Sequence, residues 1–281
     1  MLPTPQTCKT CSNSFSGKYC NQCGEKVYAE HDKSIAHVAH EVLHFVTHLD
    51  GTLLTTIKTI FTRPGKLALD YCNGSRKKYF KPISLFLLCI VLYLLFPKFD
   101  GLNMKFNSYI SSQNNYTWLT WPTAREKMGS HSITLQELNE KYNKQSAKVS
   151  KIFLLVLIPL TALVFYILFF TKRRYFFDHF IMATEFTSIM VIIVFLLLPL
   201  FIALTSFIYA PTARFFTDDN IIPVAVIHLV LLIYLSIALK RFYQQSWLLS
   251  IVKSIVFLFV FDLGVMYVYN CLLFLIVMLL V

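Results

Sequence analysis

Four cysteines near the start of the chain have the spacing of a metal site. Two Cys-x2-Cys pairs are separated by eight residues, and their members are Cys8, Cys11, Cys20 and Cys23. Each pair can present two thiolates to one tetrahedral Zn²⁺, and the short connection closes such a site without a hydrophobic core. Two disulfides or a rubredoxin-type iron site are the alternatives, but no secretory signal precedes the motif and disulfides are rare in the reducing cytosol. We therefore predict one structural zinc ion, in a closed site with no open coordination position for a substrate.

A histidine-rich segment, SIAHVAHEVLHFVTHLD, follows from Ser34 to Asp50. At about 100° per residue, its apolar residues fall on one side of a helix and its histidines on the other. Within it, HEVLH matches H-E-x-x-H, in which two histidines one turn apart bind zinc and the glutamate acts as a base. Those residues are His40, Glu41 and His44, and the sequence offers no third ligand at a familiar spacing. We predict an amphipathic helix with a polar histidine face, with a non-catalytic metal site and a metalloprotease as alternatives.

Ionisable residues also occur within apolar stretches of the chain, chiefly His179, Glu185 and Asp262. Such groups are costly at membrane depth and mark functional sites by default. A proton relay, an ion site or a metal site would be a functional role for them. A buried hydrogen-bonded pair that holds two helices together is the structural alternative.

The composition shows what kind of protein must position these residues. Of 281 residues, 56% are hydrophobic and 15% are charged, whereas soluble domains have about 45–50% apolar and about 25% charged residues. The formal net charge is +11, and much of the excess lies beside apolar segments. Membrane topology and contact with anionic lipids explain such a distribution better than nucleic-acid binding does. We predict an all-α polytopic membrane protein with anionic lipids and no nucleic acid as partners.

Five apolar segments account for the membrane part, and they are Ile83–Phe99, Ile152–Phe170, Phe180–Tyr209, Ile221–Leu239 and Ile255–Val281. The first is short, because only about 14 residues separate Ile83 from Pro97, against about 20 for a full span. If it spans, the basic loops at 171–178 and 240–253 and the basic run RPGKLALDYCNGSRKKYFKP, from Arg63 to Pro82, all lie in the cytoplasm. That arrangement obeys the positive-inside tendency. We therefore expect about five spans, with the N-terminus in the cytoplasm and the C-terminus outside.

The predicted domain order follows from these elements. Residues 1–30 form a zinc ribbon or knuckle, and residues 31–82 form cytoplasmic amphipathic helices and the basic juxtamembrane segment. Residues 83–281 form the transmembrane bundle, with an external loop at 100–150 that is expected to hold one short helix. Self-association is a further possibility for such a bundle.

Four stretches resemble an uncharacterised family of multi-pass membrane proteins from Bacteroidetes-type bacteria: CKTC…YCNQCGEK, the basic run, YFFDHF and LKRFYQQSWLLSIVKS. The resemblance covers nearly the whole chain. It implies a bacterial inner-membrane location and a zinc ribbon, and no assigned reaction.

The function expected from the sequence is a non-enzymatic scaffold or regulator that recruits a protein partner through the zinc ribbon. A transporter that uses Glu185 and Asp262, and a zinc protease that uses HEVLH, are the alternatives. The sequence leaves open whether the chain is an enzyme.

Overall fold

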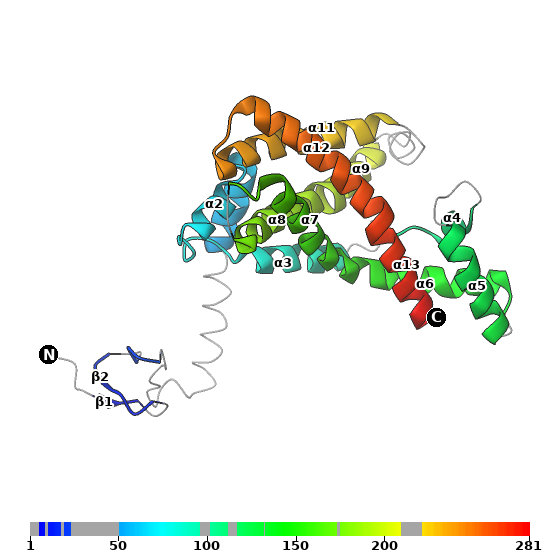
Figure 1. The fold of residues 1–281 in the computed structure, drawn as a ribbon, viewed down its shortest axis with the longest axis horizontal. Coiled ribbons are helices and arrows are strands. Elements are labelled where there is room, and N and C mark those ends of the chain that lie inside the picture. Colours follow the sequence, from blue (N-terminus) through cyan, green and yellow to red (C-terminus); the bar gives the residue numbers. More distant parts are fainter. Residues whose placement is uncertain are drawn as a thin grey trace. The chain divides into compact units, whose positions relative to one another are not determined.

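The structure is a computed structural model that forms two compact units, Met1–Thr52 and Leu53–Val281 (Figure 1). It describes residues 6–8, 11–17, 20–23, 51–95, 102–111, 117–131, 133–172, 175–208 and 221–281. The histidine-rich segment lies outside the described residues, and with it His40, Glu41 and His44. The prediction made for HEVLH therefore stays a prediction.

The first unit is built on a short hairpin. Strand β1 (Gln6–Thr7) pairs antiparallel with β2 (Ser14–Phe15), with Gln6 opposite Phe15. Between them, Cys8 N–H donates to the Asn13 carbonyl at 2.9 Å, which closes the turn. Among the described residues of this unit, the Phe15 ring is buried together with Cys8 and Cys20.

The second unit is almost entirely helical, and its first helix begins two residues before the boundary between the units. Its elements are a helix at residues 51–62, α2 (Lys66–Cys72), α3 (Pro82–Leu95), α4 (Phe106–Ile110), α5 (Thr117–His131), α6 (Leu135–Phe153), η2 (Leu154–Val156), α7 (Leu157–Phe169), α8 (Phe176–Val191), η3 (Ile192–Leu197), α9 (Leu198–Ile208), α11 (Ile221–Tyr243), α12 (Trp247–Leu263), η4 (Gly264–Tyr269) and α13 (Asn270–Leu280). Several of these run on into one another as long rods. The π-helical turn η3 ends two residues before Pro199. A proline ring clashes with the backbone of the preceding turn in a regular α-helix, and the wider turn makes room for it.

Four of the described helical rods are long and apolar enough to cross a membrane: Leu135–Phe169, Phe176–Thr205, Ile222–Tyr243 and Trp247–Leu280. They correspond to the last four predicted segments, so the prediction of a multi-pass membrane protein is confirmed. Helix α3 is described over 14 residues, which at 1.5 Å per residue cover about 21 Å of the roughly 30 Å hydrocarbon core, and residues 96–101 after it lie outside the described part of the chain. A fifth span at this position stays a prediction.

The segment between α3 and α7 holds more structure than the one short helix expected there. Helices α4, α5 and α6 and the short η2 occupy it. Tyr109 of α4 and Tyr142 of α6 are fully buried and pack on Phe274 of α13, with ring centroids 5.0 and 5.6 Å away. Sparse aromatic anchors therefore hold these polar helices against the end of the last span.

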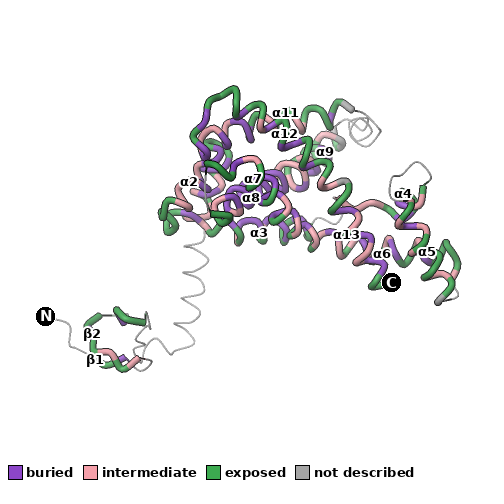
Figure 2. The backbone as a smooth tube through the Cα atoms, viewed as in Figure 1, coloured by how far each residue is buried: buried purple, intermediate pink, exposed green. Residues whose placement is uncertain are grey.

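Helix α8 lies at the centre of the bundle. Figure 2 shows it buried along most of its length, while α11 and α12 keep exposed faces. Phe186 of α8 meets the stacked pair Phe165 (α7) and Phe257 (α12), whose centroids are 4.3 Å apart. Because α8 is enclosed, its polar residues, His179 and Glu185, face protein partners rather than lipid.

Candidate functional site

The four N-terminal cysteines converge as their spacing predicted. The Sγ atoms of Cys8 and Cys23 lie 3.4 Å apart, those of Cys11 and Cys20 lie 3.6 Å apart, and all four lie within 4.8 Å of one another. These distances exceed the roughly 2.05 Å of a disulfide. Four thiolates about 2.3 Å from one tetrahedral ion would be about 3.8 Å from each other. The cluster therefore has the size and the donor set of a metal site.

The chemistry of one cysteine also suits a ligand. The backbone N–H of Cys23 donates to the Cys20 thiolate and lowers the pKa of Cys20 to about 6. Since the thiolate is the form that binds metal, such a lowered pKa favours coordination near neutral pH.

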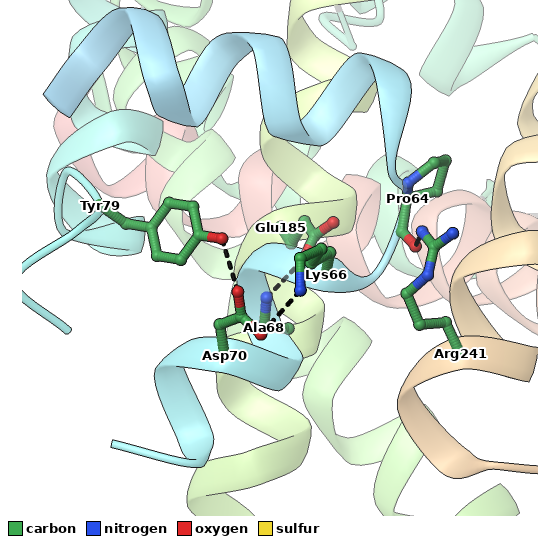
Figure 3. Close-up of polar contacts among 7 residues, drawn as sticks. All are labelled: Pro64, Lys66, Ala68, Asp70, Tyr79, Glu185 and Arg241. Atoms are coloured by element: carbon green, nitrogen blue, oxygen red, sulfur yellow. Dashed lines mark hydrogen bonds and ion pairs between the residues drawn. The ribbon is translucent and has the colours of Figure 1, made fainter. Parts of the chain in front are cut away.

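A second polar site lies where the Arg63-Pro64-Gly65 turn meets the bundle (Figure 3). Glu185 of α8 is 1% exposed, and its two carboxylate oxygens accept the backbone N–H groups of Gly65 and Ala68, each at 2.7 Å. The hydroxyl of Tyr234 on α11 donates to the same carboxylate at 3.1 Å. A buried carboxylate thus caps the first turn of α2 from another helix, where the helix dipole favours negative charge.

A backbone carbonyl of the same turn also has a side-chain partner. Arg241 of α11 donates to the carbonyl of Pro64. The backbone N–H groups of Gly65 and Ala68 therefore donate to the Glu185 carboxylate of α8, and the Pro64 carbonyl accepts from the Arg241 guanidinium of α11. We call this set, Pro64, Gly65, Ala68, Glu185, Tyr234 and Arg241, the turn clamp.

Gly65 is required at the turn for two reasons. Its φ is +77°, a region that side chains disfavour. A Cβ built there would lie 2.5 Å from the carbonyl oxygen of Ala238 and 2.9 Å from its Cα. The backbone of α11 therefore approaches the turn closely, which explains the glycine after the proline.

A further contact set steadies α2 and the loop behind it. The Tyr79 hydroxyl donates to Asp70 Oδ2 at 2.6 Å, and Lys66 pairs with Asp70 at 3.2 Å. Partial burial raises the pKa of the Asp70 carboxyl, but the hydrogen bond from Tyr79 and the pair with Lys66 outweigh it and leave this pKa below its usual value. Burial and the hydrogen bond to Asp70 raise the pKa of Tyr79 to about 12. Phe80 N–H donates to Thr56 at 2.9 Å, which ties the loop to helix 51–62.

The other intramembrane residues have separate partners. His179 is fully buried on α8, and its Nδ1 lies 2.8 Å from the Tyr243 hydroxyl of α11. Asp262 of α12 lies 3.1 Å from Nε2 of His228 on α11. His179, Glu185 and Asp262 therefore do not form one shared site. His179 and Glu185 each join helices through buried hydrogen bonds, as the structural alternative expected, whereas the contact of Asp262 is exposed.

The His228–Asp262 pair joins α11 to α12, and both side chains are exposed, at 42% and 53%. Nδ1 of His228 also lies 2.8 Å from the carbonyl oxygen of Val224 in its own helix.

This pair lies on the wall of a largely apolar cavity of about 420 Å³. The cavity is lined by residues of α8, η3, α11, α12 and η4, and by Leu102, Met104 and Asn270. Asn270 is 8% exposed, and its Oδ1 accepts no hydrogen bond from the described residues. A volume in this range is that of a small-molecule pocket.

Sequence reasoning did not find the partners in the turn clamp. Tyr234 reads as one aromatic residue within an apolar run, and Arg241 as one of several basic residues in a short loop. The signal that was available is Glu185 itself, since a carboxylate in an apolar helix needs donors.

The family model described as "Protein of unknown function (DUF3667)" matches residues 50–94. The resemblance to a family of unknown function is confirmed for this segment. No curated protein and no solved structure matches the chain. The matched segment contains helix 51–62, the Arg63-Pro64-Gly65 turn, α2 and α3, whereas Glu185, Tyr234 and Arg241 lie outside it.

Proposed function

We propose that this chain is a bacterial inner-membrane scaffold or regulator that recruits a protein partner through an N-terminal zinc ribbon. The observation that supports the proposal is the convergence of four thiol groups within 4.8 Å of one another. Four cysteine ligands complete the tetrahedral coordination of zinc and leave no position for a substrate or a catalytic water. Such a site stabilises a small folded domain, and the surface of that domain can bind a protein partner.

The residues around the cluster suit a docking surface. Asn21 and Gln22, between two of the cysteines, are exposed, as is Cys23 of the cluster itself. Asn13 and Asn21 are joined by a side-chain hydrogen bond of 2.7 Å. A small, polar, metal-stabilised domain on a membrane-anchored chain is better suited to recruiting a protein partner than to catalysis.

Metal analysis tests the site. The purified wild-type chain is expected to carry one zinc ion, and Cys20→Ser is expected to lower the zinc content at least about tenfold, because a three-thiolate site is incomplete. Cys271→Ser is the matched control and should retain the metal. Iron in place of zinc would contradict the zinc assignment. A second zinc that is lost in His44→Ala would instead support the metalloprotease reading of HEVLH.

Recruitment is tested separately from metal binding. A photo-crosslinking amino acid at Gln22 should give a discrete cross-linked protein in cells, and Cys20→Ser should abolish the product. The same probe at exposed Ser75 is the control. If the chain binds zinc but gives no product that depends on Cys20, the recruitment role is wrong.

We propose five spans, with the N-terminus, residues 171–178 and residues 240–253 in the cytoplasm and residues 100–150 outside. The positive-inside tendency supports this orientation. In a chain whose other membrane-domain cysteines are replaced by Ser, an impermeant thiol reagent added outside should label Glu126→Cys and not Ser75→Cys. Equal labelling of both positions would place them on one side and contradict a span at α3. Labelling of Ser75→Cys alone would reverse the orientation.

The cavity beside the His228–Asp262 pair favours a second candidate, proton-linked transport within the membrane. Of the two carboxylates that the transporter alternative named, Asp262 is the better suited, because Glu185 is engaged by three donors. Liposomes containing the chain and a pH-sensitive dye should then acidify under an imposed potential. Asp262→Asn should remove the flux and Glu126→Gln should not. No flux above empty liposomes would remove this candidate.

A further inference from the structure

A polar pocket of about 490 Å³ lies within the juxtamembrane segment, beside the turn clamp. It opens between helix 51–62, the start of α2 and the loop before α3. Its lining residues include no carboxylate and are Thr55, Lys58, Thr59, Thr62, Arg63, Lys66, Lys78 and Tyr79. Four of these eight side chains are cations. We call this feature the basic pocket.

The positive charge of the basic pocket is mostly uncompensated within the described part of the chain. Lys66 has a carboxylate partner, Asp70, at 3.2 Å. No described Asp or Glu lies within 4.0 Å of the charged ends of Lys58, Arg63 or Lys78. Four cations against one carboxylate leave a formal charge of +3 around a small volume. Charges of one sign gathered in a concavity raise the local concentration of counter-ions.

The hydroxyl groups of the pocket show which kind of anion would fit. Thr59 donates to the carbonyl of Thr55, and Thr62 donates to the carbonyl of Lys58, each at 2.7 Å. Tyr79 donates to Asp70. The hydroxyl hydrogens of Thr59, Thr62 and Tyr79 are therefore in use, and the charged donors of the pocket are its ammonium groups and the guanidinium of Arg63. A ligand with several acceptor oxygens and no need of a neutral donor matches that set, and phosphate is such a ligand.

The position of the pocket brings it near lipid headgroups. Lys78 precedes the apolar helix α3 by four residues. The guanidinium of Arg76, in the same loop, lies 5.7 Å from the ring of Phe177, an exposed residue at the start of α8. The pocket thus belongs to the part of the chain where polar residues meet two apolar helices.

We propose that the basic pocket binds a phosphate group, supplied either by an anionic phospholipid or by a soluble phosphate. A phosphate within it would be held by charge-assisted hydrogen bonds from Lys58, Arg63 and Lys78. The Arg63-Pro64-Gly65 turn also accepts a hydrogen bond from Arg241 and donates one to Glu185. Binding there would therefore act on the element that joins the juxtamembrane segment to the bundle.

The test uses the full chain in detergent micelles, with binding followed by the shift of its thermal unfolding midpoint at constant ionic strength. One arm titrates inorganic phosphate, and the other titrates phosphatidylglycerol with phosphatidylcholine as the neutral lipid control. The pocket variant is Lys58→Gln with Arg63→Gln. The matched control is Lys77→Gln with Lys81→Gln, which removes two exposed cations from the same segment that do not line the pocket.

The pocket variant is expected to weaken phosphate-group binding by about tenfold for each cation removed, the usual effect of losing a charge-assisted hydrogen bond. The control variant should change binding less than about twofold. Binding of phosphatidylglycerol alone identifies a lipid headgroup, and binding of inorganic phosphate alone identifies a soluble ligand.

Equal weakening in the two variants would show a diffuse surface potential and overturn the proposal, as would absence of binding in both arms. Without ligand, the two variants should unfold within about 2 °C of the wild type, because all four side chains are exposed. These outcomes do not depend on zinc, so they are separate from the test of the proposed function.

Discussion

Glu185→Ala is expected to destabilise the bundle by about 3–5 kcal/mol, the range for removing one partner of a buried charged network. The change leaves the N–H groups of Gly65 and Ala68 and the Tyr234 hydroxyl without their acceptor in a buried site. Each orphaned donor costs about 1–3 kcal/mol. The anion at the start of α2 is lost as well. Unfolding of the detergent-solubilised chain by SDS or heat measures the loss.

Two companion variants separate the causes. Glu185→Gln retains one acceptor oxygen but turns an amide N–H₂ toward a backbone donor, so a smaller loss of about 1–3 kcal/mol is expected. Glu126→Ala removes an exposed carboxylate of α5 and should stay within about 0.5 kcal/mol of the wild type. If Glu185→Ala matches Glu126→Ala, the carboxylate is not what holds the turn. Because α2 can detach locally without global unfolding, hydrogen exchange at the Gly65 and Ala68 amides supplies a second readout.

Features that depend on neighbours in sequence could be predicted. The two Cys-x2-Cys pairs placed four thiols together because the motif is local and the intervening loop is short. The places of four spans followed from apolar runs, although the rod Leu135–Phe169 begins well before the predicted Ile152. The start of α6 is a local feature of the same kind. Thr134 and Glu137 form a capping box, and the pattern Thr-x-x-Glu is typical of the first turn of a helix.

Features that depend on distant residues could not be predicted. Gly65 and Glu185 are 120 positions apart, and nothing in a single sequence pairs a turn with a carboxylate at that distance. The same holds for Arg241 and Pro64, 177 positions apart. The helices after α3 were underestimated for another reason. Their sequences are polar, and a few aromatic anchors such as Tyr109 and Tyr142 provide the burial that makes them stable.

The turn clamp gives a physical reason for the most distinctive run of the sequence. In RPGKLALDY, the arginine lines the basic pocket, the glycine allows close approach to α11, and the aspartate accepts from Tyr79. One short segment therefore connects a cationic surface to two buried contacts with α8 and α11. A ligand in the pocket and a change in the clamp would act on the same turn.

Gly65→Ala is expected to destabilise the chain by about 2–4 kcal/mol. A methyl group at this position would lie 2.5 Å from the carbonyl oxygen of Ala238, and both contacts nearest to it are backbone atoms that cannot rotate away. Overpacking of this kind costs about 1–3 kcal/mol. The φ of +77° adds about 1 kcal/mol for any residue with a Cβ.

Gly74→Ala is the matched control for this variant. Gly74 has a φ of +96°, but a Cβ there would meet no atom within 4 Å. Its replacement should therefore cost only the conformational part, about 1 kcal/mol. The difference between the two variants, measured as unfolding free energies under one condition, isolates the contact between the turn and α11. Equal losses would mean that α11 moves aside without cost, and the close approach at Ala238 would then not be a constraint on the fold.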